Sequence, residues 1–324
     1  MHVILIRQFH HFLLFSLEKW TRIPVYVNGK IKIYISFNRC NEIIKILYHF
    51  KIVPIDQLPE YPALMRSTLI SWNVNGLRQR HRMNQFTQIF QHNPQIVCIQ
   101  ETKTAEEKVR AELKSIYGYN TYFTSVKSGD IAEVALFSRQ KPMSVSYGFG
   151  DTPFDKEGRI IVADFGDFIL LNIYFPLGVE PADNITHKLA FYDAFLAYAK
   201  KLCDEKHPII VCGDFSIAHT DIDIFNPKKK PSRQVGITLK ERAKIDQLIA
   251  LGFSDTFRLF NKEPGHYSWW PNGFRLTDRT RGWRLDYFFV NELAKPLVKN
   301  AEILSCIEGS DHCPVLLEID LPEH

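Results

Sequence analysis

The sequence contains no long apolar run. No segment approaches the ~18 to 20 apolar residues that a helix needs to cross a bilayer, and the best candidate, Phe12 to Phe15, lies between His11 and Glu18. A secretory signal is also a poor match, because the N-terminal region has neither a clean apolar segment nor a small-residue cleavage site. We therefore expect no membrane partner.

Paired cysteine motifs are absent as well. The six cysteines include no C-x-x-C pair, and Cys98 and Cys212 lie inside apolar, strand-like runs. This placement suits reduced thiols in a protein core. The pattern indicates a reducing compartment, and we expect a cytoplasmic protein.

A strong excess of one charge is missing too. Lys and Arg total 40 against 36 Asp and Glu, so the formal net charge of the 324 residues is +4. That balance permits a polyanionic partner without demanding one, so the placement of the basic residues must decide. With 45% hydrophobic residues and no repeat or disordered composition, the chain can bury one or two substantial cores. We expect a globular monomer.

Residues 1–64 differ in composition from the rest of the chain. They are rich in Ile, Phe, Tyr and Lys, poor in Gly and Ala, and end in the proline-punctuated stretch 54–62. The alternation in 30–36 predicts a strand, but the region carries no recognisable chemistry. Met65 stands directly before the first core-type strand, so two explanations are open. We favour translation from an over-extended start over a small appended module, and we place the main domain at 65–321.

Within the main domain, apolar runs of strand length alternate with helical stretches. The predicted strands are Thr68–Trp72, Gln95–Gln100, Val134–Phe137, Ile160–Phe165, Phe168–Tyr174, Ile209–Cys212, Leu285–Val290 and Val315–Ile319, and the predicted helices are Gln85–Gln91, Lys188–Cys203 and Leu239–Leu251. Gly166 and Asp167 predict a hairpin turn. Many short strands, some consecutive and some separated by helices, favour an α/β (α+β) fold. We predict a four-layered α/β sandwich, in which two packed mixed β-sheets are flanked by helices.

Carboxylates, amides and an imidazole follow several of these strands. They are Asn73, Asn75, Glu101, Asp214, Asp286, Asp311 and His312. Each alone has a structural explanation as a turn or cap residue. Together, at successive strand ends, they predict one site, because loops past rigid strands are where catalytic groups tend to lie. Their oxygen-rich character suits Mg²⁺ and not zinc.

Five motifs in order resemble the exodeoxyribonuclease III type of AP endonuclease, in the endonuclease-exonuclease-phosphatase superfamily. They are Ser71-Trp-Asn-Val-Asn-Gly-Leu-Arg78, Gln100-Glu-Thr-Lys103, Gly213-Asp-Phe215 with Ile217-Ala-His219, Gly282-Trp-Arg-Leu-Asp-Tyr287 and Gly309-Ser-Asp-His-Cys-Pro314. The resemblance covers roughly Met65 to Ile319. Gly-Trp-Arg-Leu-Asp-Tyr separates this branch from relatives that cleave inositol phosphates, RNA tails or DNA non-specifically.

The resemblance implies a role for each matching residue. Glu101, with Asn73 or Asn75, would hold Mg²⁺, for which Mn²⁺ is an alternative. Asp214 would activate the attacking water, and His312 would contact the scissile phosphate. A carboxylate beside this histidine would favour its cationic form. The implied catalytic residues are Asp214, His312, Tyr174, Asp286 and Ser216, and the implied metal ligands are Asn73, Asn75, Glu101, Asp214, Asp311 and His312.

The resemblance also implies a double-stranded DNA partner with abasic sites or blocked 3′ ends. Trp269, Trp283 and Leu285 resemble an apolar pocket for a base-less sugar, although aromatic core packing is the alternative for Trp269 and Trp270. Basic residues in three flanking loops would contact phosphates without reading sequence. They are Arg78, Arg80, Arg82, Lys228, Lys229, Lys230, Arg233, Arg275, Arg279, Arg281 and Arg284.

Three departures from the family pattern lie near the expected chemistry. Ser216 stands where the pattern has Asn, Leu177 where Asn or Gln is usual, and Asp130 and Glu133 occupy a segment expected to read Gly-Tyr-Ser-Gly. The leading hypothesis is a Mg²⁺-dependent DNA repair nuclease that cuts 5′ to abasic sites and trims 3′ ends. The alternative is a catalytically impaired DNA-binding relative. A phosphohydrolase acting on small phosphates or RNA is disfavoured by the apolar pocket and the Arg-rich loops.

Overall fold

The chain divides into two compact units, Met1–Pro62 and Ala63–His324. The computed structural model describes residues 22–27, 31–36, 64–104, 113, 116–124, 134–150, 152–180, 183–227, 235–271 and 279–322. In the first unit, β1 (Arg22–Val27) and β2 (Ile31–Ser36) form an antiparallel pair, so the strand predicted within 30–36 is present. That residues 1–64 are an extension of the main domain stays a prediction.

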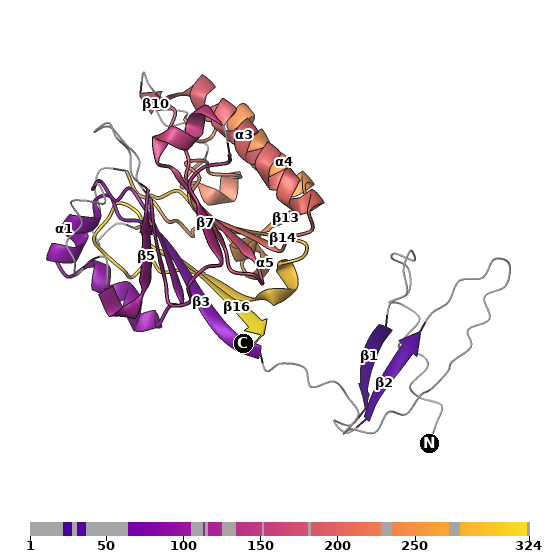
Figure 1. Ribbon diagram of the computed structural model, residues 1–324. Helices are drawn as coiled ribbons and strands as arrows, with labels where there is room; N and C mark the ends of the chain where they lie inside the picture. The colour runs from indigo at the N-terminus through magenta and orange to yellow at the C-terminus, as the bar shows by residue number, and fades with distance from the viewer. Residues whose placement is uncertain are drawn as a thin grey trace. The chain divides into compact units, whose positions relative to one another are not determined.

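The second unit contains two six-stranded sheets, which Figure 1 shows packed against each other. The first sheet has the order β15 (Val298–Ile303), β16 (Val315–Pro322), β3 (Leu64–Asn73), β4 (Ile96–Gln100), β6 (Ala135–Ser138), β5 (Asn120–Phe123). The second has the order β13 (Phe253–Asp255), β14 (Asp286–Asn291), β12 (Ile209–Asp214), β9 (Ile169–Tyr174), β8 (Ile160–Asp164), β7 (Ser144–Ser146). Each sheet is mixed, because β3 pairs with β4 and β9 with β12 in parallel while the other pairs are antiparallel.

Alternation along the strands divides the core into layers, since successive side chains of a strand point to opposite faces. In β12, Ile210 and Cys212 belong to the core between the sheets, whereas Ile209 and Val211 pack on the helical side. In β3, Leu69 faces the other sheet. Both faces of these strands are covered, which explains why their sequences are continuous apolar runs.

Helices cover the outer face of each sheet. Figure 1 shows α3 (Ile185–Asp204) and α4 (Leu239–Ala250) side by side over the second sheet, and α1 (Leu77–Arg82) on the opposite side of the molecule. Among the described residues, the other helices are α5 (Thr256–Phe260) and the 3-10 helices η3 (Phe86–His92), η5 (Ile116–Gly118), η6 (Pro153–Glu157), η7 (Asp221–Asp223) and η8 (Lys295–Leu297). In addition, β10 (Val179–Glu180) pairs with β11 (Asp183–Asn184). The four-layered sandwich is therefore confirmed.

One helix prediction needs correction, and one helix has no counterpart among the predictions. The helix predicted at Gln85–Gln91 is the 3-10 helix η3, and the sequence does not predict α1. The α1 sequence Leu-Arg-Gln-Arg-His-Arg has one apolar residue and no capping side chain at Gly76, so it carries no helical periodicity. The Gly166 turn is present as expected, and the Phe165 N–H donates to the Phe168 carbonyl at 3.0 Å.

In the part of the chain that the structure describes, no helix is both long enough and apolar enough to cross a membrane. The compartment and the oligomeric state stay predictions.

Candidate active site

In the second sheet, β9 and β12 end, and β14 begins, at one row of polar side chains. Asp214 of β12 is in register with Tyr174 of β9 and with Asp286 of β14. Gly213 allows this row to form, because its φ is +138° and a Cβ there would lie 1.8 Å from the Ile173 carbonyl oxygen. Any side chain at position 213 would push β9 away from β12.

The first sheet contributes two residues that lie beside this row. Asn73 closes β3, and Glu101 follows β4 directly. The Asn73 Nδ2 donates to Glu101 Oε1 and to Asp214 Oδ2, both at 3.0 Å. The Tyr174 hydroxyl donates to Glu101 Oε1 at 2.8 Å. These bonds join the ends of β3 and β4 in the first sheet to the ends of β9 and β12 in the second.

His312 lies in the loop before β16 and faces two carboxylates. Its Nδ1 is 2.9 Å from Asp286 Oδ2, and its Nε2 is 3.7 Å from Asp214 Oδ2. The buried Trp72 indole N–H donates to the His312 carbonyl at 3.0 Å, and the Ser310 hydroxyl accepts from the His312 N–H at 3.2 Å. The ring is therefore held from both sheets.

Asp311 connects the same loop to the end of β3. Its Oδ1 accepts from Asn75 Nδ2 at 2.9 Å, and its Oδ2 accepts from the Trp269 indole N–H at 3.2 Å. Asn75 also accepts a hydrogen bond from Lys103, whose ammonium lies 3.0 Å from Glu101 Oε2. All seven strand-end residues named from the sequence thus belong to one connected network.

Burial and neighbouring charges set the protonation of the central pair. Burial raises the pKa of the Asp214 carboxyl to about 7, with Asp286 acting in the same direction and the His312 cation opposing it. Burial alone would lower the pKa of His312, but the Asp286 and Asp214 carboxylates raise it to about 10. At neutral pH, His312 is therefore a cation held between two carboxyl groups.

The pKa values of Glu101 and Tyr174 are shifted in opposite directions. Burial by itself raises the pKa of Glu101, but the Asn73 hydrogen bond and the Lys103 ammonium bring it below its usual value. Burial and the charges of Glu101 and Asp214 raise the pKa of Tyr174 well above 10. Glu101 is thus an anion and Tyr174 a neutral hydrogen-bond donor.

The donor set is that of a metal site. The ligand atoms of Asp214, Asp286 and His312 lie within 4.8 Å of one another in a buried cluster, and Asp286 Oδ1 has no hydrogen-bond partner among the described residues. The single positive charge of His312 lies between Asp286 and Asp214. The remaining carboxylate and amide oxygens, those of Glu101, Asp311 and the asparagines, are the hard ligands that a divalent cation prefers.

An apolar cluster lies where the resemblance implies a pocket for the base-less sugar. Leu285 packs with Ala218 and Ile224, and Trp269 and Trp283 pack against this cluster. Leu285 is buried, whereas both tryptophans are partly exposed. The structure thus brings the three predicted pocket residues together.

Arg284, for which the resemblance implies a DNA contact, has a buried side chain, and a role in DNA binding stays a prediction. Its side chain is 1% exposed. Its Nε lies 2.8 Å from Asp223 Oδ1 and its Nη2 lies 2.6 Å from Asp255 Oδ2. Arg258 also binds Asp223, at 2.5 Å. Arg284 is an internal ion-pair residue between the pocket residues Trp283 and Leu285.

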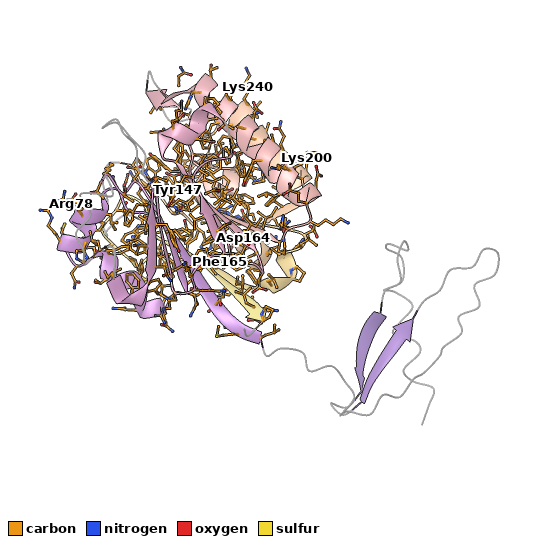
Figure 2. All side chains as sticks on the ribbon, in the orientation of Figure 1. Arg78, Tyr147, Asp164, Phe165, Lys200 and Lys240 are labelled. Atoms are coloured by element: carbon orange, nitrogen blue, oxygen red, sulfur yellow. The ribbon has the colours of Figure 1, made fainter. Side chains whose placement is uncertain are left out.

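The other basic residues divide between surface and interior. Arg78 and Arg82 of α1 are exposed, as Figure 2 shows for Arg78, and Arg281 is exposed too. Arg80 is largely buried, donates to Gln85 Oε1 at 2.8 Å and lines a cavity beside Asn75 and Asp311, and its contact with phosphate stays a prediction. Arg279 is partly buried over the Trp270 ring. Lys228 to Lys230, Arg233 and Arg275 lie outside the described residues.

The two departures that the structure describes differ in their surroundings. Ser216 is 3% exposed, and both its N–H and its hydroxyl donate to Asp214 Oδ1, at 2.8 and 3.2 Å. Leu177 is 43% exposed. Asp130 and Glu133 lie outside the described residues.

Two residues of the network were not singled out from the sequence. Lys103 closes the Gln100-Glu-Thr-Lys103 motif, and its ammonium links Glu101 and Asn75. The Ser268 hydroxyl donates to Asp286 Oδ2 at 2.6 Å and accepts from the Asp286 N–H at 3.0 Å. A lone serine before two tryptophans gives no sequence signal for this contact.

Known proteins share this architecture. Residues 70–312 match the Endonuclease/Exonuclease/phosphatase family. An exodeoxyribonuclease of Bacillus subtilis is 37% identical over 255 residues, which cover 78% of this chain and 99% of that protein. DNA repair nuclease APEX1 of Danio rerio is 34% identical over 252 residues, or 77% and 81% of the two chains. Recombination repair protein 1 of Drosophila melanogaster is 38% identical over 250 residues, or 77% of this chain but 36% of that protein.

A solved structure agrees with these sequence matches. The 3′ phosphatase NExo from Neisseria, bound to a product DNA hairpin, superposes with a TM-score of 0.70 at 26% identity, covering 79% of this chain and all of that one. The resemblance inferred from the five motifs and the expectation of a phosphodiester hydrolase are confirmed. The chain belongs to the Endonuclease/Exonuclease/phosphatase family, among the exodeoxyribonucleases and AP endonucleases that serve DNA repair.

Proposed function

We propose that this enzyme is a Mg²⁺-dependent nuclease that hydrolyses the phosphodiester 5′ to abasic sites in duplex DNA and also trims 3′ ends as a 3′-5′ exonuclease. One observation carries the proposal. The Trp269 ring of the apolar pocket lies 6.4 Å from the His312 ring, and its indole N–H donates to Asp311. A sugar without a base, swung out of the duplex into this pocket, would have its phosphate beside the polar network.

Asp214 is the general base in this proposal. A pKa of about 7 suits a group that accepts a proton from water near neutral pH. Ser216 and Asn73 donate to its two oxygens, so the carboxylate has one orientation. The attacking water gives one proton to Asp214 as its oxygen bonds to phosphorus, the bond from phosphorus to the 3′ oxygen breaks, and that oxygen takes a proton from solvent and leaves as a 3′ hydroxyl.

His312 and Tyr174 act on the phosphate. The imidazolium, oriented by Asp286, places a positive charge opposite a non-bridging oxygen, and the neutral Tyr174 hydroxyl donates a hydrogen bond there. Fixed donors of this kind stabilise the charge that develops in the transition state. Asn73, Asn75, Glu101 and Asp311 would hold Mg²⁺, or Mn²⁺ as the alternative. A bound cation would neutralise charge on the phosphate.

The test uses three duplexes that differ at one position: one with an abasic site, one intact, and one with a blocked 3′ end. Each is incubated with Mg²⁺, with Mn²⁺, or with EDTA. We expect a single cut 5′ to the abasic site and removal of the 3′ block, both abolished by EDTA. Absence of metal-dependent cleavage from all three duplexes would refute the proposal.

One observation favours a second candidate, a catalytically impaired DNA-binding relative. The only side-chain donor at position 216 is a hydroxyl, and it is already directed at Asp214. Specific binding of the abasic duplex without cleavage in any metal would support this candidate.

A further inference from the structure

A buried ion pair lies behind the turn that carries Asp214, and it takes no part in the proposed steps of phosphodiester hydrolysis. Lys188 of α3 and Glu241 of α4 are 2.8 Å apart, and both side chains are 0% exposed. Withdrawing two charges from water costs free energy that their attraction does not reliably recover, so such a pair is a weak indicator of stability. A functional explanation therefore has to come from what the two charges contact.

The ammonium of Lys188 is directed at the backbone of the active-site turn. Its Nζ donates to the Ser216 carbonyl at 2.7 Å and to the Leu177 carbonyl at 3.4 Å. These are the two described positions where the sequence departs from the family pattern. Both backbones are thus held by a group that does not depend on the side chain at either position.

Ser216 has a backbone conformation that needs support. Its φ is +52°, which few residues other than glycine adopt. In this conformation the Ser216 N–H points at Asp214 Oδ1, 2.8 Å away. The Ser216 carbonyl and N–H belong to the two peptide groups on either side of its Cα, so release of the carbonyl would let the φ of Ser216 leave this value and turn the N–H away from the carboxylate.

Glu241 holds the opposite wall of the same turn. It accepts hydrogen bonds from the Gly236 N–H at 2.8 and 2.9 Å and from the Thr238 hydroxyl at 2.7 Å. The Gly236 carbonyl in turn accepts from the Ala218 N–H at 2.8 Å. A Cβ on Gly236 would lie 3.0 Å from the Ser216 carbonyl oxygen, so this segment closes around the carbonyl that Lys188 binds.

We propose that Lys188 and Glu241 are positioning residues for phosphodiester cleavage. The ammonium binds the Ser216 carbonyl and so maintains the backbone conformation in which the Ser216 N–H donates to Asp214. Glu241 neutralises the ammonium and holds the Gly236 N–H. The inference rests on the proposed function, because it assigns the pair to the turnover of the same site. An apolar side chain could fill the space of Lys188 but could not bind the two carbonyls.

The test removes both charges together, because a single deletion would leave one buried charge unpaired and destabilise the fold. Lys188→Met with Glu241→Gln is compared with the parent in steady-state cleavage of the abasic duplex, which gives kcat. A matched control is Lys200→Met with Asp204→Asn, an ion pair of 2.6 Å on the exposed face of the same helix. Lys200 projects outward in Figure 2.

We expect the buried double variant to lose ~10 to 100-fold in kcat, because small misplacements of reacting groups have effects of this size. Its Kd for the abasic duplex in EDTA should stay within about twofold of the parent, because the pair lies beneath the turn and not on the DNA-facing surface. The control variant should match the parent in both quantities. A folded double variant with the kcat of the parent would overturn the proposal, as would an equal loss of DNA affinity.

Two further measurements cover the other outcomes. If this double variant does not fold, Lys188→Gln with Glu241→Gln, which leaves no buried charge unpaired but is too short at position 188 to hold both carbonyls, should still lower kcat, and an unchanged kcat overturns the proposal. If the parent itself does not cleave DNA, the proposed function fails and the positioning role is read from hydrogen exchange. The Ser216 amide should then exchange at least ~10-fold faster in the double variant than in the parent. Equal exchange rates would refute the positioning role independently of activity.

Discussion

Replacing Ser216 by asparagine should speed up cleavage. The serine hydroxyl lies 3.2 Å from Asp214 Oδ1 and 3.5 Å from the Phe175 carbonyl, so it is engaged with the base and its neighbour. An asparagine side chain is longer and carries two N–H donors. One of them can extend past Asp214 towards the phosphate.

The backbone favours this substitution. The φ of +52° at Ser216 is one that asparagine adopts more readily than serine. The Ser216 N–H and carbonyl contacts, to Asp214 and Lys188, do not involve the side chain. We therefore expect the free energy of unfolding to change by less than about 1 kcal/mol.

The size of the gain follows from the value of one donor. A full transition-state donor is worth ~100 to 1000-fold in rate. A water that stands in for the missing amide would already supply part of this, so we expect ~10 to 100-fold, or about 1.4 to 2.7 kcal/mol of activation free energy. Because the contact acts on developing charge, the Kd for DNA should stay nearly constant.

Single-turnover cleavage of the abasic duplex, with Kd measured separately in EDTA, provides the assay. Ser305→Asn, at an exposed serine, is the control and should match the parent. If Ser216→Asn stays at background even after Leu177→Asn is added, missing amides do not limit turnover. A parental rate already as high as that of the variant would show that serine or a water replaces the amide adequately.

Three other predictions concern the base, the DNA track and the buried ion pairs. Asp214→Asn should abolish metal-dependent cleavage while leaving folding and DNA affinity nearly unchanged, and activity within about tenfold of the parent would remove Asp214 from the mechanism. DNA binding should weaken steeply as the salt concentration rises. Arg78→Ala and Arg82→Ala should each reduce the slope of log K against log salt by about one. A flat salt dependence of the parent would contradict phosphate contacts by these residues. Burial raises the pKa of Asp223, but Arg284 and Arg258 outweigh it and lower this pKa from 3.8 to about 2. The ionised Asp223 therefore stabilises the fold above pH ~4, and this stabilisation is lost as pH falls through 2. The free energy of unfolding, measured as a function of pH, should fall by about 2 kcal/mol over this range, whereas Asp223→Asn should lack this fall and should also bind Arg284 more weakly.

The strands and the convergence of the polar residues could be predicted because both depend on local signals. The runs that became β3, β4 and β12 are apolar throughout and end in polar residues, and strands covered on both faces have this pattern. Residues at the ends of such strands meet once the sheets pack. The sequence does not predict β5, which has only 4 residues, or β15, most of whose residues are exposed or half-buried. Such strands carry little apolar pattern.

The position of a charged side chain could not be predicted in the same way. Arg284 and Arg78 look alike in the sequence, yet one is buried and the other exposed. The difference comes from Asp223 and Asp255, which are 61 and 29 residues away from Arg284. Lys188 was inside a correctly predicted helix, but its partner Glu241 belongs to another helix, and one sequence does not show such a pairing.

The alignment of Tyr174, Asp214 and Asp286 across three strands has a consequence for changes in chain length. A single residue inserted between Ile209 and Cys212 would turn the Asp214 side chain to the opposite face of the sheet. The exposed loop at 262–265 has no such constraint, and lengthening it leaves the row intact. Insertions and deletions among descendants of this gene should therefore accumulate in loops such as this one, while the number of residues in β9, β12 and β14 stays constant even where their side chains change.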